Sequence, residues 1–274
     1  MTASPFDSAH LHRLFAPGDM ARLFSDSADI RAQMIVLGAL ARVQGEAGVI
    51  PDLSGRAIHR ASLELQIDPS GLAASVAAEG ATAPALAQAF RDLMQAPDHA
   101  RYVMTGAAPA HVQDSALMLR LRQVLAQMEA ALDALLGRDL PAGARAALQA
   151  QKDGLPALRD GALWVSLPDA ALRPALAAAL GLRDPGCDWT ADRSPLRHVA
   201  GWAATLAGAL CPLARPDDPV RAAALQALAA QAAALLPLLD APDAAMAQPA
   251  EWLALPQILL CAGAALGHAE ALAA

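Results

Sequence analysis

Residues 103–122 read VMTGAAPAHVQDSALMLRLR, and this stretch decides the fold. Its second half opens the longest helical pattern of the chain, which we expect to run from about Val112 to Gly137. One apolar stripe repeats there at helical spacing, through Val112, Ala116, Leu119, Val124, Met128, Ala131 and Leu135. A stripe of that length usually packs against other long helices, so the stretch predicts a bundle of long helices.

The remaining sequence predicts further helices and little else. Apolar periodicity and turn residues place them at about 26–48, 68–79, 84–95, 170–180, 194–213, 219–239 and 249–273. Residues 139–160 are broken repeatedly by proline and glycine and predict a short irregular segment, while 163–167 predict a short extended piece. We therefore predict an all-α fold with an N-terminal helical domain over 1–110 and a helical bundle with reduced central helices over 111–274.

Composition narrows the classes of partner. Apolar residues make up 55% of the 274 residues and aromatic residues 3%, which favours tight helix packing through small side chains. The formal net charge of −7 argues against nucleic-acid binding, which needs a basic face. No uninterrupted apolar run reaches the roughly 20 residues of a membrane span, so no membrane partner is predicted.

The cysteines and the N-terminus indicate a cytoplasmic protein. Cys187, Cys211 and Cys261 are odd in number and far apart, and we interpret them as small buried residues in a reducing compartment. A disulfide framework or a zinc site has little support from this spacing. The first 15 residues, MTASPFDSAHLHRLF, do not resemble a signal peptide.

Several stretches resemble the 3-carboxy-cis,cis-muconate cycloisomerase family of the fumarase/aspartase superfamily. They are SPFDSAHLHRLF at 4–15, FSDSADIRAQMIVLGALARVQGEAGVIP at 24–51, DSALML at 114–119, GLRDPGCDW at 181–189 with AGW at 200–202, AEWLALP at 250–256 and GAALGH at 263–268. Together they cover most of the chain. The resemblance implies an all-α fold, oligomers whose active sites draw on several chains, and lactonisation of 3-carboxymuconate in aromatic catabolism without a cofactor.

The polar groups of that family are largely missing from the matching positions. Where the family has a loop of the form H-x-G-x-T-S-x-D, gapless alignment places Met104, Gly106, Ala108, Pro109 and His111, and only the glycine is kept. The family's G-R-T-x-x-Q-x-A loop and its G-S-S-x-M-P-x-K-x-N-P signature have no counterpart, and at least one core helix is expected to be missing. After Trp189 the family's histidine is replaced by Thr190.

Few residues remain as candidates for binding a polycarboxylate ligand. They are Gly106, His111, Arg193 and His198; no catalytic residue is assigned and no metal ligand is found. The alternative for His111 is a solvent-facing loop residue, and for Arg193 and His198, with Arg197, a surface cluster near a helix start. Glu251, which matches the family, is interpreted as structural.

Two hypotheses follow from these observations. In the first, the chain is a degenerate, non-catalytic binding or oligomerisation module, either a homo-oligomer (a dimer rather than the family tetramer) or a hetero-oligomer with a full-length relative. In the second, it is an active cycloisomerase or lyase on a muconate-like polycarboxylate, with a rebuilt pocket around Arg193, His198 and His111. The loss of donors favours the first, because a lactonising pocket must stabilise a developing anion.

Overall fold

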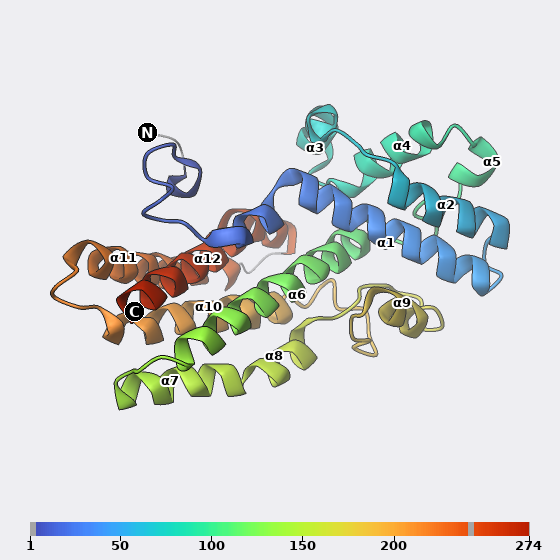
Figure 1. The fold of residues 1–274 in the computed structure, drawn as a ribbon. Helices are drawn as coiled ribbons and strands as arrows, with labels where there is room; N and C mark the ends of the chain where they lie inside the picture. The colour runs from blue at the N-terminus through green and yellow to red at the C-terminus, as the bar shows by residue number, and fades with distance from the viewer. Residues whose placement is uncertain (1–3, 241–243, 274) are drawn as a thin grey trace. The chain divides into compact units, whose positions relative to one another are not determined.

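The computed structural model describes residues 4–240 and 244–273, and these confirm the predicted all-α fold (Figure 1). Within those residues β pairing is limited to an isolated parallel bridge between Trp164 and Arg183. The bridge falls in the segment predicted to be extended. The Val165 amide donates to the Arg183 carbonyl at 2.8 Å, and the Arg183 amide donates to the Leu163 carbonyl at 2.9 Å.

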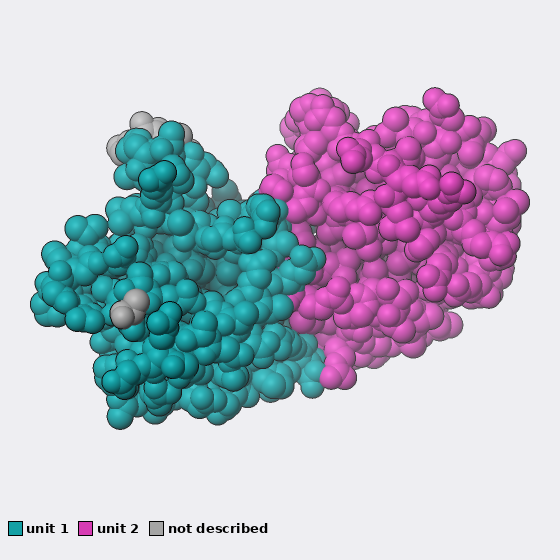
Figure 2. All heavy atoms as spheres, in the orientation of Figure 1, with its two compact units in different colours: residues 1–24, 123–162, 193–274 teal, residues 25–122, 163–192 magenta. Residues whose placement is uncertain are grey.

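The chain forms two compact units that interleave along the sequence (Figure 2). Unit 1 comprises Met1–Phe24, Gln123–Ala162 and Arg193–Ala274, and unit 2 comprises Ser25–Arg122 and Leu163–Asp192. Helix α6 (Pro109–Leu136) contributes its first half to unit 2 and its second half to unit 1. The boundary between residues 110 and 111 stays a prediction.

The long apolar stripe of α6 is buried as the sequence predicts. Six of its seven members are at most 6% exposed, and Ala131 is half-buried: the six are Val112, Ala116, Leu119, Val124, Met128 and Leu135. Burial of these side chains provides the hydrophobic stabilisation that a helix of this length needs, because helix propensity alone contributes little.

Unit 2 is built on a pair of closely packed helices. Its elements are α1 (Asp26–Glu46), α2 (Asp52–Glu64), a 3₁₀ turn (Pro69–Leu72), α3 (Ala73–Glu79), α4 (Ala83–Met94), α5 (Pro97–Ala100), the first half of α6, and α9 (Arg173–Leu180). Ser25 caps α1 by accepting from the Ala28 amide. Glycine allows α1 and α2 to approach: a Cβ at Gly55 would lie 2.5 Å from the Ala41 carbonyl oxygen.

Unit 1 is a bundle around α10. It contains α7 (Ala142–Asp153), α8 (Leu155–Ala162), α10 (Ser194–Leu210), α11 (Pro219–Leu235), α12 (Ala244–Leu272) and the second half of α6, with short 3₁₀ turns at Pro5–Asp7, Gly18–Phe24, Cys211–Leu213 and Leu236–Asp240. Helices α10, α11 and α12 pack against one another, and α7 and α8 pack against α10 (Figure 1). The N-terminal segment is fixed to α12, because His268 Nε2 donates to the Leu14 carbonyl at 2.6 Å.

The prediction that 139–160 is irregular is wrong, because the segment forms α7 and most of α8. The residues taken as helix breakers mark helix ends instead. Pro141 is the residue before α7, Gly154 ends it, and Pro156 is the second residue of α8. Proline is tolerated in the first turn of a helix because the amide it lacks would have no intrahelical partner there.

Although no uninterrupted apolar run reaches the length of a membrane span, two segments of the described residues are long and apolar enough on average to cross a membrane. Pro219–Asp240 and Ala247–Leu272 both meet that criterion by length and composition. Counting uninterrupted runs missed them, because isolated polar residues interrupt both. In the second, 61% of the most apolar stretch is buried inside the protein, as in the core helix of a soluble bundle, whereas in the first only 33% is buried.

Candidate functional site at the start of helix α6

The loop before α6 carries two residues in the left-handed conformation. Met104 has φ +66° and Gly106 has φ +70°. Glycine adopts this conformation without cost, which explains Gly106 better than contact with a ligand does, whereas methionine rarely adopts it. The loop is held from α1, since Gln44 Nε2 donates to the Thr105 carbonyl at 2.7 Å.

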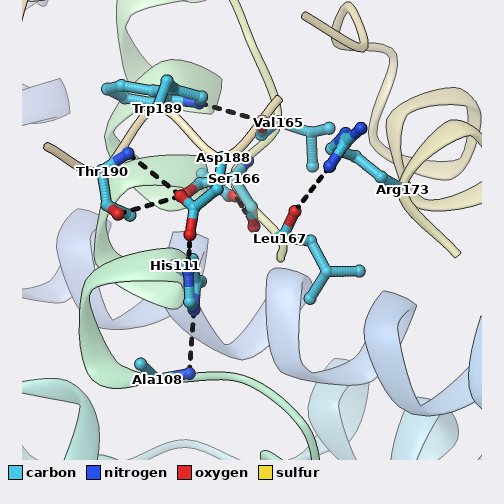
Figure 3. A network of polar contacts seen from close by, with 10 residues as sticks. Ala108, His111, Val165, Ser166, Leu167, Arg173, Asp188, Trp189 and Thr190 are labelled. Carbon is cyan, nitrogen blue, oxygen red and sulfur yellow. Dashed lines mark hydrogen bonds and ion pairs between the residues drawn. The ribbon is translucent and has the colours of Figure 1, made fainter. Parts of the chain in front are cut away.

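His111 lies in the first turn of α6 and uses both ring nitrogens within the protein (Figure 3). The backbone amide of Ala108 donates to Nδ1 at 2.9 Å, and Nε2 lies 3.1 Å from Asp188 Oδ2. A backbone amide can only donate, so Nδ1 is the acceptor and Nε2 carries the proton of the neutral ring. The interpretation of His111 as a solvent-facing loop residue is therefore wrong: the residue is 7% exposed.

The contact between His111 and Ala108 reproduces half of a helix capping box. In that motif the third residue of the helix, usually glutamate or glutamine, reaches back to the amide of the residue before the helix. Pro109 is the first residue of α6, so His111 is the third and Ala108 the residue before. The histidine thus satisfies one of the amides that a helix start leaves without a partner.

Asp188 is the meeting point of the network. Its Oδ1 accepts from the Thr190 amide at 3.1 Å and from the Thr190 hydroxyl at 2.9 Å, while Oδ2 faces His111. Partial burial by itself raises the pKa of Asp188, but the hydrogen bonds from Thr190 and His111 outweigh it and hold that pKa below its usual value. The carboxylate is therefore charged at neutral pH.

Buried polar contacts hold the Asp188 loop and α6 in place. The Trp189 indole donates to the Val165 carbonyl at 2.9 Å and is 1% exposed. Ser115, one helical turn after His111, accepts from the Ser166 amide at 2.9 Å. Arg173 continues the network, since its Nη1 donates to the Leu167 carbonyl at 3.2 Å (Figure 3). These contacts connect the Asp188 loop, α6 and the segment 165–167 within unit 2.

The other two candidates, Arg193 and His198, belong to unit 1, whereas Gly106 and His111 belong to unit 2. Arg193 lies at the start of α10 and forms two short hydrogen bonds to Glu251 of α12, from Nε at 2.7 Å and from Nη2 at 2.6 Å. Glu251 is 6% exposed. The ion pair agrees with the interpretation of Glu251 as structural, and His198 is exposed on α10. The assignment of the four candidates to a ligand site stays a prediction.

Sequence reasoning missed the partners that define the network: Asp188, Thr190 and Ser115. An Asp-x-Thr sequence is a recognisable signal for a local turn in which the carboxylate accepts from the amide two residues on. That signal locates the turn at Asp188 but not its contact with His111, which lies 77 residues away. A single sequence gives no direct information on such a pairing.

The geometry restricts the chemistry that His111 can perform. A histidine–aspartate pair supports acid–base catalysis when the ring's other nitrogen reaches the substrate, but here that nitrogen accepts from the Ala108 amide. No group of three or more His, Cys, Asp or Glu side chains suited to a metal ion occurs among the described residues. One groove of about 490 Å³ in unit 2 includes none of the four candidates in its lining, which is Ser27, Ile30, Arg31, Met34, Leu63, Leu65, Gln66 and Ile67.

Comparison with known proteins relates the chain to the 3-carboxy-cis,cis-muconate cycloisomerases. The chain is 34% identical over 123 residues to 3-carboxy-cis,cis-muconate cycloisomerase of Pseudomonas aeruginosa, a match that covers 44% of this chain and 27% of that enzyme. The matched stretch therefore spans little more than a quarter of that curated relative. No protein-family model matches the chain.

Two solved structures share the fold. The β-carboxy-cis,cis-muconate cycloisomerase of Acinetobacter calcoaceticus superposes with a TM-score of 0.85 at 22% identity, covering 92% of this chain and 74% of that one. The 3-carboxy-cis,cis-muconate lactonizing enzyme of Pseudomonas putida superposes with a TM-score of 0.83 at 25% identity, covering 93% and 73%.

Proposed function

The chain is a relative of the 3-carboxy-cis,cis-muconate cycloisomerases with a fumarase/aspartase-like fold, and from this premise we propose that it is a non-catalytic member that works as a binding or oligomerisation module. The observation that carries the proposal is the state of the predicted ligand-binding side chains. Both ring nitrogens of His111 form hydrogen bonds within the protein, and Arg193 forms two hydrogen bonds to Glu251.

The loop before α6 provides further support. Between Met104 and Pro109 the hydroxyl of Thr105 is the single side-chain donor, and Pro109 lacks a backbone amide. The Ala108 amide is already donated to His111. A positioned acid or base is worth roughly 10²–10⁴ in rate, and one donor to a developing anion about 10²–10³. A loop that lacks such an acid, base or donor supports the proposal that the chain has kept the fold and not the reaction.

Exposed apolar side chains on unit 1 support an association role. Val220 (63% exposed) lies on α11 and Leu238 (49%) follows it, while Trp252 (46%) and Leu253 (66%) lie on α12. Unit 2 also exposes large apolar side chains, at Val49, Leu53, Leu63 and Leu93, so both units offer apolar surface for association. We infer a cytoplasmic homo-oligomer, a dimer rather than a tetramer, or a hetero-oligomer with a full-length relative.

An activity assay tests the proposal. The purified chain is first assayed by itself with 3-carboxy-cis,cis-muconate as substrate. It is then mixed with a full-length cycloisomerase whose concentration is held fixed. We expect no lactone from the chain alone and a changed rate or altered elution of the relative in the mixture. The relative alone at the same concentration is the control.

Turnover by the chain alone would contradict the proposal. If that turnover were lost in both Arg193→Ala and His198→Ala, the function would instead be an active cycloisomerase or lyase with a rebuilt pocket. Light scattering checks the association role separately, and a monomer that stays monomeric with the relative present would remove it.

A further inference from the structure

We propose that His111 is a proton-operated latch: the neutral ring fastens the loop 104–108 to the start of α6, and uptake of one proton releases that loop. The inference concerns the conformation of unit 2 and holds whether or not the chain turns over a substrate. It rests on the two contacts of the ring, at 2.9 Å to the Ala108 amide and at 3.1 Å to Asp188.

The neutral ring satisfies both neighbours at once. Its Nδ1 lone pair accepts from the amide of Ala108, and its Nε2 proton is donated to the Asp188 carboxylate, so that the ring lies between its two partners (Figure 3). Because the ring is almost completely buried, its two nitrogens depend on these two partners, whereas Ala108 and Asp188 are themselves exposed to water.

A second proton on the ring changes the two contacts in opposite ways. It must occupy Nδ1, where it faces the N–H of Ala108, and two donors cannot form a hydrogen bond. The contact between Nε2 and Asp188 becomes an ion pair and persists, although the Asp188 side chain is 37% exposed and water weakens the attraction. Proton uptake therefore releases Ala108 and keeps Asp188.

The other charged groups near the ring do not change which of the two contacts is lost on protonation. Asp188 is the charged partner from the loop after α9. On α6 itself, Asp114 lies one turn on, is 3% exposed and makes contacts of its own. Arg173, the other charge drawn in the network, is held by Asp184 at 2.6 Å.

The released loop has a reason to move. Met104 is held in a left-handed conformation that side chains rarely adopt, so the loop relaxes when one of its tethers is lost. The second tether, from Gln44 to the Thr105 carbonyl, does not titrate and remains. The opening is thus local to 104–108 and leaves the helix pair α1 and α2 in place.

The first measurement is ¹⁵N NMR of the histidine rings in the full chain. At pH 8 we expect the His111 ring to show a proton on Nε2 and a bare Nδ1, with assignment by comparison with His111→Gln. A ring that carries its proton on Nδ1 at pH 8 would overturn the proposal, because the Ala108 amide would then have no acceptor.

The second measurement is hydrogen exchange of the Ala108 amide between pH 8 and pH 5, corrected for intrinsic exchange rates. We expect its protection to fall roughly fivefold to tenfold in the wild type once the ring is protonated, the size of one lost hydrogen bond. His111→Gln presents an amide oxygen that accepts but does not titrate, so its protection stays constant. His198→Gln, at an exposed histidine, is the matched control and behaves as the wild type.

The outcomes separate the latch from a merely structural histidine. Equal pH dependence in the wild type and His111→Gln would overturn the proposal, as would constant protection in the wild type. Should His111→Gln fail to fold, the wild type decides alone. The Ala108 amide shift must then titrate together with the His111 ring, and separate midpoints would overturn the proposal.

Discussion

Arg193 and Glu251 form a two-point ion pair that joins the start of α10 to α12, with the carboxylate oxygens 2.7 and 2.6 Å from Nε and Nη2. The two side chains are 14% and 7% exposed. Removing one partner of a buried pair costs about 3–5 kcal/mol, because the other charge is left without compensation. We expect Arg193→Met to lower the free energy of unfolding by about 3 kcal/mol in urea titrations.

The double variant Arg193→Met with Glu251→Leu isolates the coupling, since it removes both charges. We expect it to recover most of the lost stability, as apolar replacement of a whole buried pair is often neutral or favourable. A double variant as unstable as the sum of the two single variants would show that the pair contributes nothing beyond its separate side chains.

Asp184 gives unit 2 a pH-dependent stability. Burial acts to raise the pKa of Asp184, but the Gly186 amide and Arg173 outweigh it and lower that pKa below 3.8. The folded state binds its proton less readily than the unfolded chain. The stabilisation is therefore complete above about pH 3.8 and is lost as the pH falls through the lower folded value.

The expected consequence is that Asp184→Asn lowers the urea midpoint at pH 7 and that its difference from the wild type shrinks below pH 3.8. Asp217→Asn is the matched control: Asp217 also pairs with an arginine, Arg215, but both side chains are more than half exposed, so its midpoint should hardly change. A difference for Asp184→Asn that is the same at pH 7 and pH 2.5 would contradict the assignment.

Two glycines should respond oppositely to alanine. A Cβ at Gly55 would meet the Ala41 carbonyl oxygen at 2.5 Å, a backbone atom that cannot move without separating α1 and α2. We expect Gly55→Ala to destabilise the protein by about 1–3 kcal/mol. Gly208, exposed in α10 with nothing within 4 Å, should gain about 0.5–1 kcal/mol as alanine. Urea unfolding of both variants tests the pair, and the same sign for both would contradict it.

The three cysteines should react with thiol reagents at very different rates. Cys187 is exposed, which corrects the expectation that all three are buried, whereas Cys261 is buried and burial raises its pKa to about 12. We expect the folded chain to react at Cys187 first, with Cys211 slower and Cys261 unreactive until unfolding. Cys187→Ser should abolish the fast phase seen by absorbance. A fast phase that survives in this variant would contradict the assignment.

The elements were predictable where local patterns suffice. The stripe from Val112 to Leu135 identifies α6. Burial of one helix face requires apolar residues at helical spacing, and this spacing can be read directly from the sequence. The same reasoning failed between Pro141 and Pro156. The number of glycine and proline residues in this segment predicts an irregular chain. Their position at helix ends, however, makes them compatible with α7 and α8.

The site was less predictable than the fold. The sequence predicts Gly106 and His111 as ligand-binding candidates, yet the environment of His111 depends on Asp188, which is remote in sequence. Glu251 and Arg193 lie 58 residues apart and were noted separately without their contact. Polar pairs of this kind leave no periodicity, so composition and spacing cannot reveal them.

The hydrogen bond from His268 to the Leu14 carbonyl joins residues 254 positions apart. During synthesis on the ribosome, the N-terminal segment cannot dock until α12 has been made. The same holds for Met20, whose side chain lies against Gly263 of α12. For most of translation this segment is thus open to chaperones and proteases. Its docking is expected to be among the last steps by which a newly made chain matures.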